Sequence, residues 1–308
     1  MRDPRQAKGR RNFVSETLRR IIFPLPEDQK TQGFEPNLYT RALRRLARVL
    51  ILLLRVNGRN RFSNELIQML DPKVKVKLPT QEELVFRTGH GRLLWRAATL
   101  LSEEPLIIEW INKFRVGDCF YDVGANVGNY SLYAAKRGTT TFAFEPELNN
   151  VSLLYDNIFL NQLQGYCTPI PIALGDTTKI DVFYLKSLSK GDALHSIGRP
   201  SYLLNEPSGL PLKLDTLVMR LDDMVDLFGL RPPTKMKIEV DFNELRVLEG
   251  AEKTLGTVSE LYLALSSKLE EHATAMEFLK ARSFHIISQE DTLDTPRSGL
   301  SNYIFAKT

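Results

Sequence analysis

Short apolar runs alternate with amphipathic stretches along residues 116–308. Apolar runs of four to eight residues are typical of buried strands, and apolar positions three or four apart are typical of helices. Strands are predicted at 119–123, 140–144, 168–173, 180–185, 235–240, 260–264, 284–287 and 303–306. Helices are predicted at 130–136, 149–161, 221–228, 244–254 and 273–281. This alternation predicts an α/β fold, with a mainly parallel sheet covered on both faces and an antiparallel C-terminal edge hairpin.

The first 115 residues have a different pattern. Residues 74–88 predict two short strands around a turn, and residues 100–114 predict a helix. Residues 39–56 predict an amphipathic helix with arginines on its polar face. That helix either packs on the domain, lies in a membrane surface against anionic lipid, or binds a partner protein. We therefore predict a basic, partly disordered extension (1–60), a lead-in hairpin and helix (61–115), and an α/β domain (116–308).

Charge is distributed unevenly along the chain. The net charge is +4, yet residues 1–60 hold 14 Lys and Arg against 5 Asp and Glu, so the remaining residues are mildly acidic. The basic character therefore belongs to the extension and argues against a nucleic-acid substrate. Two cysteines give no disulfide framework, and we find neither a secretory signal nor an apolar span of about 20 residues. We expect a cytoplasmic protein, with membrane association through residues 39–56 as an alternative; the sequence indicates no oligomeric state.

The most informative stretch joins the predicted strand 119–123 to the helix that follows it. It reads D-x-G-x-N-x-G, with Asp122 at the strand end and Gly124 and Gly128 in the turn. Glycine lets a backbone approach a ligand closely, and nucleotides bind at this end of a doubly wound sheet. The G-x-G-x-x-G spacing of a dinucleotide site is absent, and an acid at Asp122 suits a cationic ligand. The turn thus favours S-adenosylmethionine (SAM) over NAD.

Glu145 ends the next predicted strand. The carboxyl ends of neighbouring parallel strands meet at one edge, so we expect Glu145 beside the turn. Its two oxygens can accept hydrogen bonds from both hydroxyls of a ribose. We expect Asp122 and Glu145 to grip the cofactor together; the alternative is that both cap the helices that follow them.

Six segments in this order resemble the FkbM family of SAM-dependent methyltransferases over roughly residues 93–308. They are DVGANVGNYSLYAAKRG, FAFEPELNNVSLLYDNIFLN, IALGD, LDDMVD, MKIEVDFNELRVLEGAEKTL and NYIFAK, preceded by the similar lead-in WRAATLLSEEPLIIEWI. The resemblance implies a Rossmann-like class I methyltransferase fold. It also implies that SAM is bound by Asp122, Gly124, Ala125, Asn126, Gly128 and Glu145, with Ala173, Leu174 and Asp176 near its adenine.

The chain departs from the family after the strand 235–240. Where the family usually reads I-D-V-E-G-x-E, this chain has an exchanged pair of acids, Glu239 and Asp241, and Phe242 in place of glycine. Two functions stay open. One is O-methylation of a hydroxyl on a sugar, glycan or natural product. The other is a catalytically impaired SAM-binding protein, recruited to a membrane or partner through its basic N-terminus; an NAD(P) oxidoreductase is a third, weaker interpretation.

Methyl transfer to a hydroxyl needs a group that removes the proton. Asp241 or Glu239 is predicted as the base or as an anchor for the substrate, because crowded carboxylates raise each other's pKa. His195, in a segment placed to cover the site, is the other candidate base. Alternatively, two carboxylates hold a divalent cation that acidifies the hydroxyl. His90, His272 and His285 lack partners at zinc-ligand spacing, so no zinc site is expected.

Overall fold

The computed structural model describes residues 71–199, 212–241, 243–292 and 299–307, together with Ala42, Arg45, Leu46 and Val49. The chain divides into two compact units, one of Met1–Pro72 with Thr88–Trp95 and one of Lys73–Arg87 with Arg96–Thr308. Boundaries at residues 60 and 115 stay a prediction. The helix expected over residues 39–56 falls outside the described residues, apart from those four positions, which are helical. Within the described part of the chain, no helix is long and apolar enough to cross a membrane.

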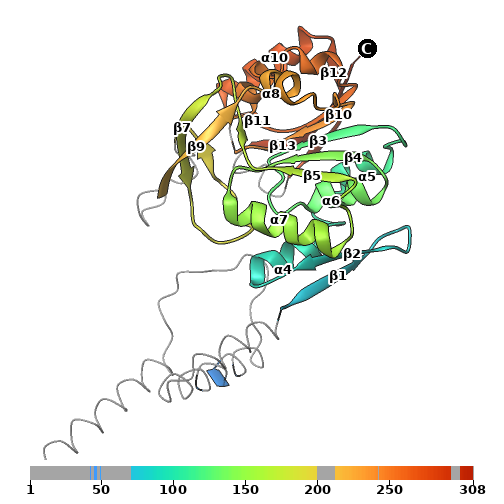
Figure 1. The fold of residues 1–308 in the computed structure, drawn as a ribbon. Coiled ribbons are helices and arrows are strands. Elements are labelled where there is room, and N and C mark those ends of the chain that lie inside the picture. Colours follow the sequence, from blue (N-terminus) through green and yellow to red (C-terminus); the bar gives the residue numbers. More distant parts are fainter. Residues whose placement is uncertain are drawn as a thin grey trace, which may run out of the picture. The chain divides into compact units, whose positions relative to one another are not determined.

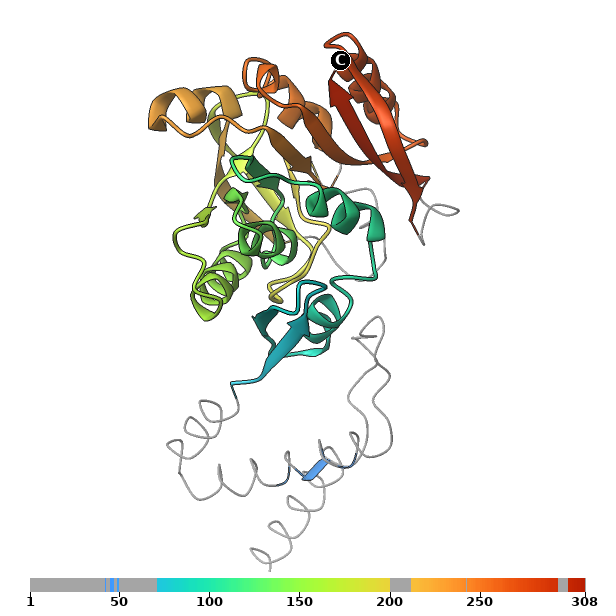
Figure 2. The same cartoon turned by 90° about the vertical axis from the view of Figure 1, so that its right-hand side faces the viewer.

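A seven-stranded sheet forms the centre of the larger unit (Figure 1). Its order is β12-β13-β11-β10-β3-β4-β5, with β3 Cys119–Val123, β4 Thr140–Phe144, β5 Cys167–Ile170, β10 Lys235–Ile238, β11 Glu260–Ser266, β12 Phe284–Asp291 and β13 Leu300–Lys307. The five strands from β5 to β11 are parallel, whereas β13 is antiparallel to both of its neighbours. The mainly parallel Rossmann-like sheet and its antiparallel hairpin are thus confirmed. β13 inserts beside β11 and leaves β12 at the edge, as Figure 2 shows.

Helices cover both faces of this sheet, as predicted. α5 Pro105–Asn112, α6 Asn129–Lys136 and α7 Leu148–Leu160 pack on one face, where Phe120 and Tyr262 lie. α8 Leu221–Phe228, α9 Glu244–Glu249 and α10 Glu270–Lys280 pack on the other, against Tyr121 and Met236. Because side chains alternate along a strand, β3 and β11 supply residues to both cores.

The strand order reverses between β3 and β10. The chain runs from β3 outward to β4 and β5, and then returns to β10 on the other side of β3. In open α/β sheets, the crevice outside the carboxyl ends of the strands at such a reversal is where ligands bind. The topology therefore directs attention to the segments that follow β3, β4 and β10.

A second sheet was not predicted. Its order is β6-β9-β7-β8, from β6 Ala173–Leu174, β7 Lys179–Leu185, β8 Ser196–Ile197 and β9 Leu212–Met219. It has its own small core, made of Ala173, Phe183, Leu185, Ile197 and Val218. This sheet matters for function because the segment between β7 and β8 contacts the residues after β3 and β10.

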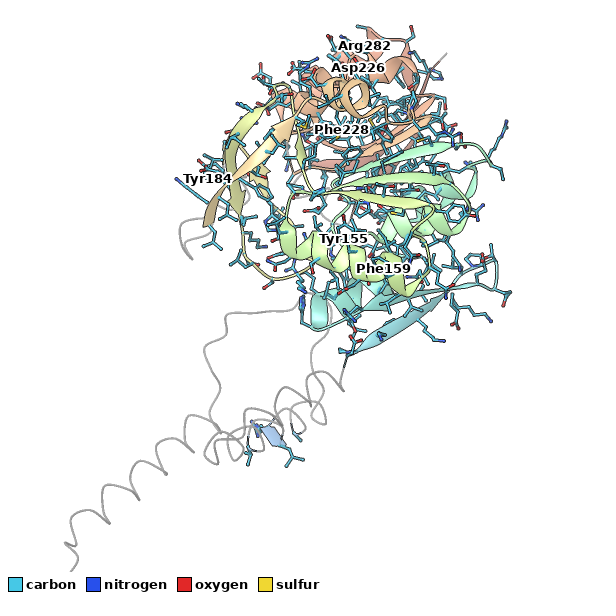
Figure 3. The ribbon with its side chains drawn as sticks, viewed as in Figure 1. Tyr155, Phe159, Tyr184, Asp226, Phe228 and Arg282 are labelled. Atoms are coloured by element: carbon cyan, nitrogen blue, oxygen red, sulfur yellow. The ribbon has the colours of Figure 1, made fainter. Side chains whose placement is uncertain are left out.

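The two short strands predicted over 74–88 form a hairpin of β1 Lys73–Lys77 and β2 Glu83–Arg87. Side-chain amides of α7 and of its C-cap residue bind the free edge of β2: Asn157 accepts the Arg87 amide at 2.9 Å, and Asn161, the C-cap, accepts the Val85 amide at 2.7 Å. On the outer face of α7, Tyr155 and Phe159 remain exposed (Figure 3). The two asparagines thus act in packing, and the hairpin belongs to the larger unit.

Several predicted boundaries were wrong. The helix expected from residue 100 begins only at Pro105, because proline is tolerated in the first helical turn but not further inside, and α4 Gly91–Ala98 was missed. The strand expected over 168–173 splits into β5 and β6. The helix expected over 244–254 ends at Glu249, and a short 3₁₀ turn, Thr254–Gly256, follows.

Candidate functional site

The turn after β3 lies directly against the end of β10. Gly124 has φ +83°, and a Cβ there would stand 1.9 Å from the carbonyl oxygen of Glu239. Gly128 has φ +91° and precedes the first residue of α6. Both positions therefore need glycine. At Gly124, the backbone of the turn after β3 lies directly against the backbone at the end of β10.

Glu145 lies beside this turn, as its position after β4 predicts. Its Oε2 accepts the backbone amide of Asn126 and its Oε1 accepts that of Glu147, both at 2.9 Å. Burial raises the pKa of this carboxyl to about 7, although the two amides oppose the rise. The N-cap of α7 is Glu147, which accepts the amide of Asn150, so the capping alternative does not apply to Glu145.

Asp122 has different partners. It is 1% exposed, its Oδ2 accepts the Ser131 hydroxyl at 2.5 Å, and its Oδ1 lies 3.3 Å from the ammonium of Lys237. The carboxylate is thus already matched by a cation of the protein. Its cation is Lys237, which stands opposite Asp122 in the sheet register, so Asp122 and Glu145 have separate partners. Joint binding of a cationic cofactor by the two carboxylates stays a prediction.

Lys237 is the functional-site residue that sequence reasoning missed. It is 1% exposed, and its Nζ also lies 2.9 Å from Glu239 Oε2 and 5.7 Å from the centre of the Tyr130 ring. Burial lowers its pKa, but the carboxylates of Glu239 and Asp122 outweigh burial and hold the pKa above its ordinary value. Lys237 in turn holds the pKa of Glu239 below its ordinary value, against burial. Both groups are therefore charged near neutral pH.

Asp241 follows β10 in a left-handed backbone conformation, with φ +52°. Its Oδ2 accepts the backbone amide of Leu194 at 2.7 Å. Burial and the negative charges of Glu239 and Glu244 raise the pKa of this carboxyl to about 7, against the amides of Leu194 and His195. A carboxyl that titrates near neutrality is suited to accept a proton during catalysis. The neighbouring Phe242 lies outside the described residues.

Glu244 is a structural residue of the same region. It is buried, its Oε1 accepts the Val240 amide at 3.1 Å, and its Oε2 lies 3.0 Å from Nε2 of His272 on α10. These contacts hold the segment after β10 against α10. Because Asp241 lies in this segment, the same contacts stabilise its backbone conformation.

The segment between β7 and β8 contacts both the turn after β3 and the residues after β10. The carbonyl of Asp192 accepts the side-chain amide of Asn126 at 2.7 Å, while Leu194 donates to Asp241. His195 lies in this segment, but its buried ring packs on the edge of Phe183 and its Nδ1 accepts the Lys186 amide at 3.1 Å. The segment contacts the site through its backbone, whereas these ring contacts hold the imidazole on the second sheet; a catalytic role of His195 stays a prediction.

The residues expected near adenine lie in or beside the second sheet. Ala173 and Leu174 form β6, which pairs with β9. The carboxylate of Asp176 binds the guanidinium of Arg246 at 3.0 and 3.2 Å, and this contact lowers its pKa. The structure does not join Asp176 to the turn, and a role for these residues toward adenine stays a prediction. Cys119 and Cys167 are free and buried.

A metal site finds no support in the described ranges. Within them, no group of three or more His, Cys, Asp and Glu side chains is placed to hold a metal ion. Lys237 already occupies the position between the carboxylates of Asp122 and Glu239 that a cation would need.

Comparison with known proteins identifies the family. A sequence profile of the FkbM methyltransferase domain matches residues 122–286, which is more than half of the chain. The chain is 24% identical over 206 residues to the 31-O-demethyl-FK506 methyltransferase FkbM of Streptomyces tacrolimicus, covering 59% of this chain and 78% of that protein. It is 24% identical over 168 residues to the hexuronic acid methyltransferase AglP of Haloferax volcanii, covering 54% and 63%.

Among solved structures, the methyltransferase FkbM of Methylobacillus flagellatus is similar at 16% identity with a TM-score of 0.43, covering 67% of this chain and 47% of that one. The chain therefore spans about half the length of that relative. The profile match and the order of elements around the D-x-G-x-N-x-G turn lead to one assignment: this chain belongs to the FkbM family of SAM-dependent methyltransferases.

Proposed function

We propose that this chain transfers the methyl group of SAM to a hydroxyl oxygen of a sugar, glycan or natural-product acceptor. The observation that carries the proposal is the meeting of three features at one sheet edge: the glycine turn after β3, the Glu145 carboxyl, and Asp241. The substrates named for the two curated relatives, 31-O-demethyl-FK506 and a hexuronic acid, support an acceptor of this class.

The cofactor site would be formed by Gly124, Asn126, Gly128 and Glu145. The fit rests on the glycine turn, where a side chain at Gly124 would collide with Glu239, and on a buried carboxylate beside it. Glu145 accepts one backbone amide on each oxygen and is also hydrogen-bonded by the Asn150 side chain. Two carboxylate oxygens offer about four acceptor positions, so one position remains for a ribose hydroxyl. SAM supplies a methyl group on a positively charged sulfur. Asp122 would act indirectly, by holding Lys237 and the first turn of α6 in place.

Asp241 would accept the proton that the acceptor hydroxyl loses as its oxygen bonds to the methyl carbon. A positioned general base contributes about 10²–10⁴-fold to such a step. Asp241 is favoured over His195 because its carboxyl titrates near neutrality beside the turn, whereas the His195 ring is held on the second sheet. Glu239, kept ionised by Lys237, is better suited to bind the acceptor than to gain a proton. No residue cluster suited to a divalent cation is present in the described part of the chain, so no step is assigned to such an ion.

The experiment is methyl transfer from radiolabelled SAM into a mixed carbohydrate and lipid extract, with the wild type and Asp241→Asn. Each protein's SAM affinity is measured by isothermal titration calorimetry. We expect label transfer by the wild type, loss of transfer in the variant, and equal SAM affinity in both. SAM binding without transfer in the wild type would instead support the impaired-enzyme alternative, which Phe242 in place of the family glycine favours.

A further inference from the structure

A layer of polar side chains lies on the α5 and α6 face of the sheet, next to the proposed site. Asp122, Lys237 and Tyr262 are neighbours in register across β3, β10 and β11. Asn302, on β13, pairs with Ala264, which lies two residues beyond Tyr262 toward the carboxyl end of β11. Glu104, just before α5, closes the layer. Its Oε1 lies 3.5 Å from the Asn302 amide nitrogen, and its Oε2 accepts a short hydrogen bond from the Tyr130 hydroxyl.

Two groups in this layer have hydrogen-bonding capacity that the protein does not use. Asn302 is 2% exposed and Tyr262 is fully buried, yet Asn302 Oδ1 and the Tyr262 hydroxyl have no partner among the described residues. Buried polar atoms are nearly always hydrogen-bonded, so such an atom calls for an explanation. The amide nitrogen of Asn302 contacts Glu104, which places the Asn302 side-chain amide beside the carboxylates of the layer. This pair of atoms points to a hydrogen-bonding ligand.

The layer opens to solvent at Glu239, whose side chain is 42% exposed. The negative charge of Glu239 acts on Asp241, the proposed base, two residues later, so the two carboxylates lie close together. Lys237 contacts both Glu239 and the Tyr130 ring, and Tyr130 and Asn302 both contact Glu104. These contacts connect the proposed reaction centre with Asn302.

The layer carries more negative than positive charge. Its cation Lys237 contacts both Asp122 and Glu239. Arg96, which donates to the Gly191 carbonyl, adds one positive charge near Glu239, and the carboxylate of Glu103 adds one negative charge beside it. Glu104 remains as a further acid, and burial together with the charge of Glu239 raises its pKa to about 7. The layer thus has a net negative charge, with Glu104 adding to it above neutrality.

We propose that Glu104, Glu239 and Asn302 bind the methyl acceptor and select an uncharged, hydroxyl-bearing molecule over an anionic one. The inference rests on the proposed O-methyltransferase function and deepens it. The carboxylates and the Asn302 carbonyl are acceptors, which hydroxyls satisfy as donors, whereas a carboxylate or phosphate brings only acceptors and a like charge. This specificity would separate the chain from AglP, which is named for hexuronic acid.

The test uses the full chain saturated with S-adenosylhomocysteine and two probes of the same shape, methyl β-D-glucopyranoside and methyl β-D-glucuronide. Binding of each probe is measured by saturation-transfer NMR titration. We expect the uncharged glucoside to bind and the glucuronide to bind at least about tenfold more weakly, because like charges a few ångström apart repel strongly in a protein.

Substitutions show which residues bind the glucoside and which cause the preference for the uncharged probe. Asn302→Ala should weaken glucoside binding several-fold, and Glu104→Gln should narrow the difference between the two probes at pH 8. The control is Glu109→Gln, an exposed acid on α5, which should change neither. Glu104→Gln keeps the shape of the side chain, so it remains informative if Asn302→Ala does not fold.

Three results would overturn the proposal: a glucuronide that binds as tightly as the glucoside, no binding of the glucoside, or an unchanged preference in Glu104→Gln. Calorimetry with S-adenosylhomocysteine on the same samples distinguishes failure of the acceptor subsite from failure of the proposed methyltransferase function. If that ligand binds and the sugar result fails, only the acceptor subsite is wrong. If that ligand does not bind the wild type, the proposed function fails instead.

Discussion

Gly124→Ala tests the close contact between the turn after β3 and the end of β10. Gly138→Ala is a matched control, because Gly124 and Gly138 have nearly equal φ angles of +83° and +84°. A left-handed conformation costs a residue with a side chain about 1–2 kcal/mol, and both variants share this cost. At Gly138 a Cβ meets nothing within 4 Å, whereas at Gly124 it lies 1.9 Å from the Glu239 oxygen. Shifts forced by overpacking cost about 1–3 kcal/mol more.

The free energy of unfolding should therefore fall by about 1–2 kcal/mol in Gly138→Ala and by about 2–5 kcal/mol in Gly124→Ala. Urea denaturation measures both, and an unchanged slope shows that the variants unfold between the same states. Calorimetry should show that Gly138→Ala keeps wild-type affinity for SAM while Gly124→Ala loses it. Equal stability and equal SAM affinity in the two variants would refute the reasoning.

Four further predictions follow from the buried titratable groups. Glu145→Gln should weaken SAM binding about tenfold or more at pH 8, since hydrogen bonds to charged groups contribute about 1.5–3 kcal/mol. As the pH drops below about 7, the wild type should lose affinity for SAM because Glu145 becomes protonated. Calorimetry across pH should find no such loss in the variant. Because the ionised form of Asp241 accepts the proton, wild-type kcat/KM should rise with pH through about 7. Asp241→Asn should lower kcat by about 10²–10⁴-fold with SAM affinity unchanged; full activity in the variant would exclude Asp241 as the base. Burial raises the pKa of Cys119 and Cys167 to about 12, so a thiol reagent at pH 8 should label them only after unfolding.

The pattern of the sequence was sufficient for the central sheet and the position of the turn. Apolar runs such as Cys119–Val123 are buried on both sides and leave little choice of structure. The glycine turn and Glu145 could be placed together because parallel strands bring their carboxyl ends to one edge. These inferences use only local pattern and a general rule of topology.

Lys237 could not be found in this way. It lies between Met236 and Ile238, and a lysine at alternating positions of a strand is typical of a solvent-facing side. Only the register of β3 against β10 places it opposite Asp122 and shows that the two charges neutralise each other. For the same reason the sequence could not show that a cation of the protein already pairs with Asp122.

The second sheet was missed because its pairing is non-local. β9 is largely exposed along its first half, and its partner β7 precedes it by a long connection. Consequently the sequence placed His195 over the site, whereas the sheet holds its ring against Phe183 and offers the backbone of the same segment instead.

The central claim is that the turn after β3 and the tip of β4 hold the nucleoside of SAM beside Asp241. A crystal structure with S-adenosylhomocysteine measures this directly. We predict the ribose hydroxyls within hydrogen-bond distance of the Glu145 carboxylate and the sulfur facing Asp241. A nucleoside bound elsewhere, with Glu145 still engaged only with the amides of Asn126 and Glu147, would contradict the claim.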